Sequence, residues 1–426
     1  MGGAAGMPLR NRASRALGSQ RGIALVLVVL ALTALLLMAG LALDVSHALL
    51  GKTRLQNTVD AAALAAAKTL DQTGSSLLAT AEALSAFGSN ASAAGNQELA
   101  AGYAQGAGSI RVTVQYSSTL GPFTPGAAAG PYVRVIATGF NLPTWLAQLG
   151  GITQTTVGAS AVAGPSATVV TACNVVPLVA CGDPGAGAAN LWGYTQNAPA
   201  VLKYAASGSS QVGPGNYQLL RLGGSGANVV RQNLAGDYSS CATVGDSLST
   251  QPGNAAGPTA DGLNTRFGQY SGPLSQSQYP PDVVVKGQSP ALTADSSGNV
   301  WQGSTRITAA NIALLYDYQN YSGDLGNSAS YDYQPVSAGG PGVFQRRVLT
   351  VPIGDCAAGS GGTNSIPLLG FGCFFMLQPV NQNGSSNDVI GQFVAGCDTN
   401  GTPGPSPSGV GPHLIELYRD PDSGDS

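Results

Sequence analysis

Charged side chains are scarce in this sequence. Asp, Glu, Lys and Arg together make up 9% of the 426 residues, whereas soluble domains carry about 25%. The formal net charge is −3, although domains that bind nucleic acid normally carry a clustered excess of basic residues. We therefore expect no nucleic-acid partner. The 60 glycines favour turns and strands over charged surface helices.

Histidine and the common catalytic motifs are also scarce or missing. His47 and His413 are the only two histidines, and no GxSxG, HExxH or GxGxxG motif occurs. A Ser–His–Asp triad or a zinc site is therefore poorly supplied. Gly51-Lys52-Thr53 resembles the end of a phosphate-binding loop, but Ser46 stands where that loop needs its first glycine. We expect no enzymatic activity, no cofactor, no metal ion and no small-molecule substrate.

Cysteine is confined to the second part of the chain. The six residues contain no CxxC pair, and their even number favours disulfides in an oxidising compartment. Free buried thiols and metal ligation are the alternatives, and the spacing does not separate the fifteen possible pairings. The candidate disulfide cysteines are Cys173, Cys181, Cys241, Cys356, Cys373 and Cys397.

One long uncharged run lies near the N-terminus. Residues 23–43 read IALVLVVLALTALLLMAGLAL, and as a helix they would extend about 31 Å, the thickness of a bilayer's hydrocarbon core. Four arginines precede this run and Asp44 follows it, so the positive-inside rule places residues 1–22 in the cytoplasm and everything after Asp44 outside. A cleaved signal peptide is the alternative, but its apolar region usually spans only about 7–15 residues.

The helical pattern continues beyond the predicted span. Apolar residues recur in steps of three and four as far as Leu70, and an alanine-rich stretch follows residue 60. We expect one helix from about residue 22 to residue 71, ending before Gly74. Small side chains permit the close approach of another helix, and we expect this face to dock on another membrane component. Packing against the protein's own meander is the alternative. The predicted membrane exit and helix interface consists of Asp44, Leu55, Val59, Asp60, Ala62, Ala63 and Ala66.

Three short segments of this helix carry a family resemblance. They are RG at 21–22, GLALDV at 40–45 and RLQNTVDAAALAAA at 54–67. Together they resemble the N-terminal module of TadG-like Flp pilus assembly proteins. The resemblance implies a role in assembling and exporting Flp pili, with other Tad/Flp assembly proteins or pilins as partners. Pilins processed by prepilin peptidase carry Glu at the position of Leu27, so we expect a permanent anchor here.

The remainder of the chain predicts strands. Segments 110–116, 132–138 and 153–162 alternate between apolar and polar residues, and the pilin-like resemblance implies that they form a meander on the helix. The predicted fold class is α+β: a transmembrane helix extended into a pilin-like helix and β-meander over 44–165, then a β-rich, disulfide-stabilised domain over 170–398. In that domain only 309–318 looks helical. The Pro/Gly/Ser-rich tail 399–426 is predicted to be disordered.

Five tyrosines lie close together in the sequence beside several aspartates, which suggests a contact surface. Ordinary strand and loop aromatics explain the same pattern. The predicted protein is a single-pass component of the bacterial inner membrane with a large periplasmic region. A surface-displayed adhesin is the alternative, and a secreted hydrolase is a weaker one. The candidate contact residues are Tyr316, Tyr318, Tyr321, Tyr331 and Tyr333.

Overall fold

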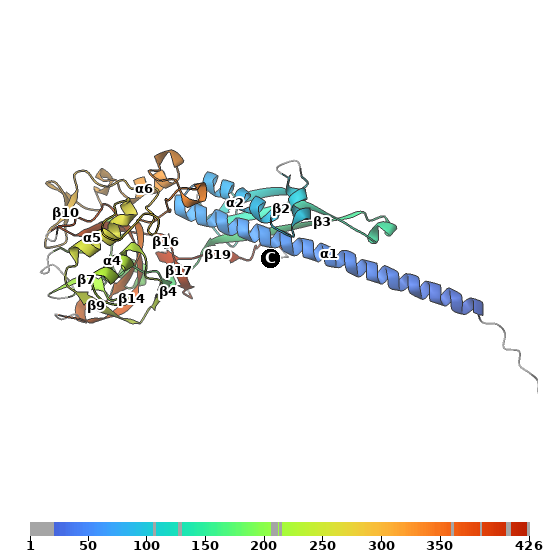
Figure 1. Ribbon diagram of the computed structural model, residues 1–426, viewed down its shortest axis with the longest axis horizontal. Coiled ribbons are helices and arrows are strands. Elements are labelled where there is room, and N and C mark those ends of the chain that lie inside the picture. Colours follow the sequence, from blue (N-terminus) through green and yellow to red (C-terminus); the bar gives the residue numbers. More distant parts are fainter. Residues whose placement is uncertain are drawn as a thin grey trace, which may run out of the picture.

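The computed structural model describes residues 21–104, 108–126, 130–205, 212, 215–358, 362–383, 386–405 and 410–423. The fold is α+β, as predicted. A long helix leads into a helix–sheet unit, and a larger β-rich unit packs at the far end of that helix (Figure 1). We call these two units the N-terminal module and the outer domain.

Helix α1 (Arg21–Thr73) confirms the predicted continuous helix. Its 53 residues extend about 80 Å at 1.5 Å per residue. The apolar half projects from the body of the molecule (Figure 1), and only 6% of its most apolar 18-residue stretch is buried. The helix ends at Gly74, whose φ of +63° is a backbone conformation that favours glycine at a helix C-terminus.

The N-terminal module packs the second half of α1 against two shorter helices and an antiparallel sheet. Small residues of α1 and α2 interleave with the inner face of the sheet in one apolar core. This arrangement confirms the predicted helix and meander, and a strand from much later in the chain completes the sheet. The added elements are α2 (Ser76–Ala91), α3 (Gln97–Tyr103), β1 (Arg111–Ser117), β2 (Tyr132–Pro143), β3 (Gln154–Pro165) and β19 (Ile415–Tyr418).

Strands β2 and β3 form an arm that runs beside α1 toward its N-terminal end (Figure 1). Residues 144–153 join the two strands, and we call them the hairpin tip. The tip contains the 3-10 turn η2 (Ala147–Gly150), which ends at Gly151 with a φ of +87°. The arm thus extends well beyond α2, while α1 continues beside it and past its end (Figure 1).

The outer domain is built on a mixed sheet of seven strands. Two buried clusters of apolar side chains cover its faces. The strands are β5 (Ala180–Cys181), β6 (Pro199–Lys203), β7 (Asn216–Leu220), β9 (Ser247–Pro252), β13 (Val348–Gly354), β14 (Ser365–Met376) and β15 (Val389–Val394).

Small sheets and short helices surround this sheet. The smaller sheets comprise β10 (Leu292–Ala294), β11 (Val300–Gln302) and β12 (Thr305–Ile307); β4 (Val169–Cys173), β8 (Cys241–Thr243) and β17 (Asn400–Pro403); and the parallel pair β16 (Gly396–Asp398) and β18 (Gly411–His413). The short helices are α4 (Ala227–Ala235), α5 (Ala256–Asn264), α6 (Tyr318–Leu325) and the 3-10 turns η3 (Ala188–Gly193), η5 (Thr265–Phe267), η6 (Ile312–Leu314), η7 (Ser328–Ser330), η8 (Val336–Ala338) and η9 (Cys356–Ala358).

The helix expected at 309–318 is wrong in position. That segment contains η6, and α6 begins only at Tyr318. Asp317 sets this boundary, because its side chain accepts a hydrogen bond from the backbone N–H of Asn320 while the Asn320 side chain bonds the Asp317 backbone. A reciprocal cap of this kind favours a helix start at that point.

All six cysteines form disulfides, which confirms the predicted oxidised domain. Cys173 pairs with Cys241, Cys181 with Cys356, and Cys373 with Cys397, across sequence separations of 68, 175 and 24 residues. The free-thiol and metal alternatives therefore do not apply to these residues.

The prediction of a disordered tail over 399–426 is wrong for most of its described residues. Strand β17 pairs with β4, β18 pairs with β16, and β19 pairs with β3. Residues 406–409 and 424–426 of the tail lie outside the described residues. Low apolar content did not prevent folding here, because backbone hydrogen bonds to existing sheet edges order the chain.

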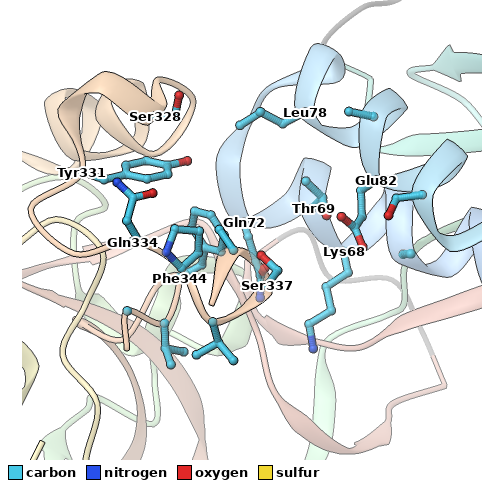
Figure 2. Close-up of a pocket in the computed structure, with 18 residues that line it drawn as sticks. Lys68, Thr69, Gln72, Leu78, Glu82, Ser328, Tyr331, Gln334, Ser337 and Phe344 are labelled. Atoms are coloured by element: carbon cyan, nitrogen blue, oxygen red, sulfur yellow. The ribbon is translucent and has the colours of Figure 1, made fainter. Parts of the chain in front are cut away.

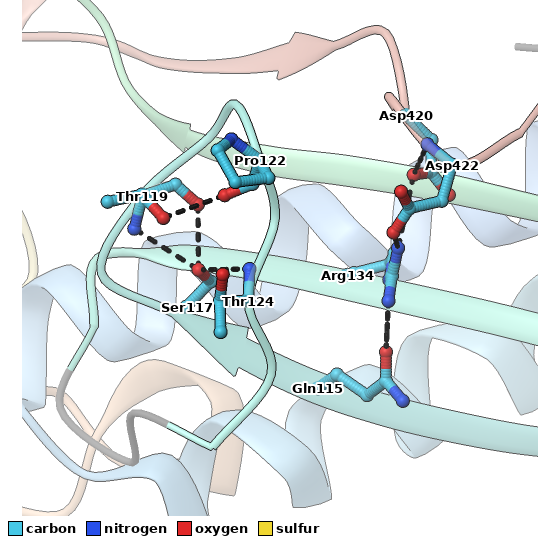
Figure 3. A network of polar contacts seen from close by, with 8 residues as sticks. All are labelled: Gln115, Ser117, Thr119, Pro122, Thr124, Arg134, Asp420 and Asp422. Atoms are coloured by element: carbon cyan, nitrogen blue, oxygen red, sulfur yellow. Dashed lines mark hydrogen bonds and ion pairs between the residues drawn. The ribbon is translucent and has the colours of Figure 1, made fainter.

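Polar side chains fasten this tail to the N-terminal module. The Arg134 guanidinium on β2 is buried and donates to Gln115 at 2.8 and 3.0 Å, to Asp420 at 3.4 Å, and to Asp422 (Figure 3). At the end of β1, the Ser117 hydroxyl accepts from the backbone N–H groups of Thr119 and Thr124 in the following loop. Ion pairs between Arg134 and the two aspartates therefore hold the C-terminal segment at the point where it joins the sheet.

Candidate functional site

Helix α1 is the element on which the candidate site is built, because it contacts the hairpin tip near its middle and the outer domain at its end. Asp44 lies at the first of these contacts and is 7% exposed. Its carboxylate accepts hydrogen bonds from the backbone N–H groups of Trp145, Leu146 and Ala147, at 2.8, 3.0 and 2.6 Å. The predicted membrane exit is thus also the attachment point of the hairpin tip.

His47 lies one turn beyond Asp44 and faces the same tip. Its ring stacks on the Trp145 indole, with centroids 4.7 Å apart and an angle of 11° between the planes. One ring nitrogen lies 2.8 Å from a carboxylate oxygen of Glu98 in α3. Trp145 and His47 therefore form an aromatic pair at the end of the apolar half of α1.

The small-residue face of α1 is buried inside this chain. Leu55, Val59, Ala62, Ala63 and Ala66 each have no exposed surface, and they pack against α2, β2 and β3. The predicted use of this face as a helix interface with another protein is therefore wrong. Its alanines do permit close approach, but the neighbour is the protein's own sheet and second helix.

Asp60 also makes an internal contact. The Gln56 side chain donates both to an Asp60 carboxylate oxygen at 2.7 Å and to the Ser160 carbonyl of β3 at 2.8 Å. Asp60 is half-buried. The residue therefore helps to position α1 on the sheet.

The end of α1 meets the outer domain through a cluster of charged residues, which we call the joint. It comprises Lys68, Asp71, Asp398 and His413. A ring nitrogen of His413 lies 2.9 Å from an Asp71 oxygen, and the Lys68 ammonium lies 3.3 Å from Asp398. The Gln345 side chain also donates to the Asp71 carbonyl at 3.1 Å. The joint fixes the outer domain on the last turns of the helix.

Charge and burial compete at the joint. Burial disfavours protonation of the His413 ring, but the hydrogen bond and charge of Asp71 outweigh it and raise the pKa of His413 above its ordinary value. Burial likewise raises the pKa of Asp398, although Lys68 opposes that shift. The His413–Asp71 contact is therefore a charged pair when the ring is protonated.

An open cleft lies beside the joint. It has a volume of about 720 Å³, and Figure 2 shows it between α1 and α2 on one side and the segment 328–344 on the other. Tyr331 and Phe344 face it from the outer domain, and Lys68 and Leu78 face it from the helices. Val336 on the rim is 60% exposed. The cleft is lined by both units of the molecule.

The five tyrosines predicted to form a contact surface do not form one exposed patch. Tyr321 is fully buried, and its hydroxyl donates to Asp282 at 2.6 Å. Tyr316 donates to Asp324, and Tyr331 donates to the Leu325 carbonyl. Tyr318 packs against the same apolar cluster, and Tyr333 is half-buried. Tyr316, Tyr318, Tyr321 and Tyr331 therefore pack in or against the core of the outer domain, which is the ordinary explanation given above for the pattern, and Tyr331 also lines the cleft.

Within the described part of the chain, no three His, Cys, Asp or Glu side chains gather in a way that would hold a metal ion. Sequence reasoning did not anticipate the roles of Trp145, Arg134 and His413. Their partners lie about 100 to 340 positions away in the chain. A single tryptophan within a long uncharged stretch was the one available signal.

Comparison with known protein families finds a match to the residues of α1. Residues 22–69 match the family model Tad, described as putative Flp pilus-assembly TadE/G-like. This match confirms the resemblance noted in the sequence, and it covers nearly all of α1. It supports involvement in Flp pilus assembly. No curated protein and no solved structure was found to match the chain.

Proposed function

We propose that this chain is a non-enzymatic structural component of Flp pilus assembly, anchored in the inner membrane by α1. The observation that carries the proposal is the TadE/G-like match on a helix that is continuous from its exposed apolar half into a folded core. An exposed apolar helix of this length suits a bilayer. Because the joint fixes the outer domain on the same helix, the anchor also sets that domain's position.

The proposed orientation places residues 1–22 in the cytoplasm and the outer domain outside. Two independent features support it. Four arginines precede the apolar run, as the positive-inside rule requires of a cytoplasmic segment. All three disulfides lie beyond the run, and disulfides persist in the periplasm but are rare in the cytoplasm.

Protease treatment of spheroplasts tests this orientation. We expect the outer domain to be digested and a small membrane-bound fragment to remain. A reporter fused at residue 1 should stay protected until the membrane is permeabilised. Full protection of the outer domain would contradict the orientation.

The proposed partners are other Tad/Flp assembly proteins or pilins. The small-residue face of α1 is unavailable to them, because the protein's own core covers it. We propose instead that a partner segment enters the cleft, where it would contact both the TadE/G-like helix and the outer domain. The tyrosine cluster, which the alternative of an adhesin would use as its contact surface, lies largely in the core.

A charged substitution in the cleft tests the partner contact. Val336→Asp introduces a carboxylate on the rim, and Leu314→Asp is the matched control, because Leu314 is 67% exposed but lies outside the cleft lining. We expect fewer pili from the first variant and normal pili from the second, with both proteins folded. Equal pilus output from both variants would contradict the cleft proposal.

Deletion and graded expression test the assembly role as a whole. A deletion strain should retain cellular pilin but lose pilin from the sheared surface fraction, and the full chain should restore it. A structural component acts in stoichiometric amounts, so surface pilin should fall in step with expression of this protein. Normal pili in the deletion strain would contradict the proposed function, and full output at very low expression would contradict the non-enzymatic role.

A further inference from the structure

The hairpin tip carries exposed apolar side chains that its own core does not use. Trp145 is 51% exposed, Leu149 77% and Ile152 57%. No Asp, Glu, Lys or Arg occurs from residue 135 to residue 182, so the arm is uncharged beyond Arg134. Soluble proteins seldom expose contiguous apolar surface of this kind without a binding partner.

The tip lies against the apolar half of α1. Leu37 and Leu41 of the helix share an apolar groove of about 360 Å³ with Leu146, Leu149 and Ile152 of the tip. Gly40 permits this approach, because a Cβ atom there would overlap the Leu146 side chain. The helix surface on either side of the groove is exposed and apolar. Helix and tip therefore form one continuous apolar surface.

Hydrogen bonding at the tip suits a water-free environment. Asp44 accepts from three consecutive backbone N–H groups, and the N–H groups of Thr144, Leu149 and Gly151 donate to carbonyls within the tip. The Thr144 hydroxyl donates to the Ile152 carbonyl. Irregular backbone is costly in lipid unless its polar groups are satisfied internally. The tip meets that condition at these positions.

The aromatic pair marks a depth along the helix. Trp145 stacks on His47 beside Asp44, where the apolar run ends. Tryptophan favours the boundary between lipid headgroups and acyl chains. From Asp44 back to Leu37 the helix rises about 10 Å, and this is the stretch that the tip accompanies.

We propose that the hairpin tip inserts into the outer leaflet of the membrane beside α1, so that the protein contacts the bilayer at two points rather than one. Trp145 lies at headgroup level, and Leu149 and Ile152 lie among the upper acyl chains. The inference rests on the proposed membrane anchoring by α1. Its consequence is that α1 is restrained from rotating about its own axis, because the arm projects from only one side of the helix.

Fluorescence quenching of Trp145 tests the insertion. The full chain is reconstituted into phosphatidylcholine and phosphatidylglycerol vesicles that carry bromine on the upper acyl chain, and the same is done with Trp145→Phe. Trp192 and Trp301 belong to the outer domain, so the difference between the two proteins isolates Trp145. We expect this difference signal to be quenched by brominated lipid and shielded from aqueous acrylamide.

A pair of charged variants supplies the matched control. Leu149→Asp places a charge on the tip, and Leu77→Asp places one on α2 at an equally exposed position, 79% against 77%. A charge in hydrocarbon is costly, so we expect Leu149→Asp to reduce brominated-lipid quenching of Trp145 by about twofold or more. Leu77→Asp should leave it unchanged.

Three outcomes would overturn the proposal. Quenching of Trp145 by acrylamide alone, with the chain still resistant to carbonate extraction, would place the tip in water while leaving the anchor intact. Trp145 could instead be shielded from both acrylamide and brominated lipid. If that shielding disappears when the protein-to-lipid ratio is lowered, a second copy of the chain covers the tip. An equal loss of quenching in the two Asp variants would remove the specific role of Leu149. Release of the chain by carbonate would instead contradict the proposed anchoring itself.

Discussion

The N-terminal module and the outer domain are held together by different means. The module contains no cysteine, and its core consists mainly of alanine and other aliphatic side chains between helices and a regular sheet. The outer domain has many strands of six residues or fewer, three disulfides and several buried charges. Long regular elements bury enough apolar surface by themselves, whereas short strands and long loops need further restraints.

The two units also differ in where their buried charged side chains lie. Arg347 is fully buried among aromatic rings of the outer domain and donates to the carbonyls of Val284 and Met376. Burial raises the pKa of the neighbouring Asp282 to about 6, although Arg347 lowers it. In the module, by contrast, Asp44 and Arg134 are buried at the edges, where they fasten the hairpin tip and the returning chain. The outer domain thus buries charged groups such as Arg347 in its interior. The buried charged groups of the N-terminal module, Asp44 and Arg134, lie where other segments attach to it.

Removal of the longest disulfide loop should have the largest effect. Cys181→Ala with Cys356→Ala opens a loop of 175 residues, and on loop-entropy grounds we expect the free energy of unfolding of the outer domain to fall by about 5 kcal/mol. Urea unfolding followed by Trp192 and Trp301 fluorescence, in a Trp145→Phe background, measures it. The helical circular dichroism of α1 should survive. If the variant unfolds at the same urea concentration as the parent protein, the outer domain does not depend on this disulfide as the contrast between the two units requires.

Overpacking the module should have the next largest effect. Ala62→Leu adds bulk to a fully buried position, and we expect a loss of about 1–3 kcal/mol in stability. Thermal unfolding followed by circular dichroism measures it. Ala65→Leu is the matched control, because Ala65 is half-buried and faces the open cleft. Unchanged stability with lost pili would instead restore a partner-binding role for this face.

The joint should respond to pH. Because the pKa of His413 in the folded protein lies above its ordinary value of about 6.5, protonation of the ring stabilises the joint. That contribution is complete below the ordinary value and is lost as the pH rises through the raised pKa. We expect the hydrogen-exchange protection factors in β18 and the last turn of α1, which are corrected for the intrinsic pH dependence of exchange, to fall over that rise. His413→Gln should abolish this dependence, and an unaltered pH profile in the variant would assign it to another group.

The second ion pair of the joint should matter least. Lys68 is more than half exposed, and exposed ion pairs contribute about 0–1 kcal/mol because solvent screens them. Lys68→Ala should therefore shift the thermal midpoint slightly, and added salt should erase the difference from the parent protein. A loss comparable to that of Ala62→Leu would show that the joint, and not the small-residue core, dominates the stability of α1.

Local pattern was sufficient to predict the helix, the three strands of the meander and the presence of disulfides. Helical periodicity and a stop at Gly74 are properties of neighbouring residues. The hydrogen-bond partners of Asp44 could not be predicted in this way, because they lie 101 to 103 positions away in the sequence. The cysteine pairings span 24 to 175 residues, and no spacing rule selects among them.

The two wrong site predictions have a common physical cause. Small side chains at Ala62 and Ala63 indicate that something packs closely, but they do not indicate whether that neighbour belongs to the same chain. Aromatic side chains such as Tyr321 suit an interface and a core equally well. In both cases burial by distant segments decided the outcome, and burial is a property of the fold rather than of the local sequence.

In the proposed orientation, strand β19 has a consequence for the order in which the two units of the protein can fold. It pairs with β3 across about 250 positions of chain, and Arg134 binds Asp420 and Asp422 beside it (Figure 3). In the proposed orientation the N-terminal module crosses the membrane first, and its sheet is incomplete until the whole outer domain has followed it. A polypeptide truncated within the outer domain would leave the Val162–Pro165 edge of β3 open, and an unpaired strand edge is a template for pairing with other chains.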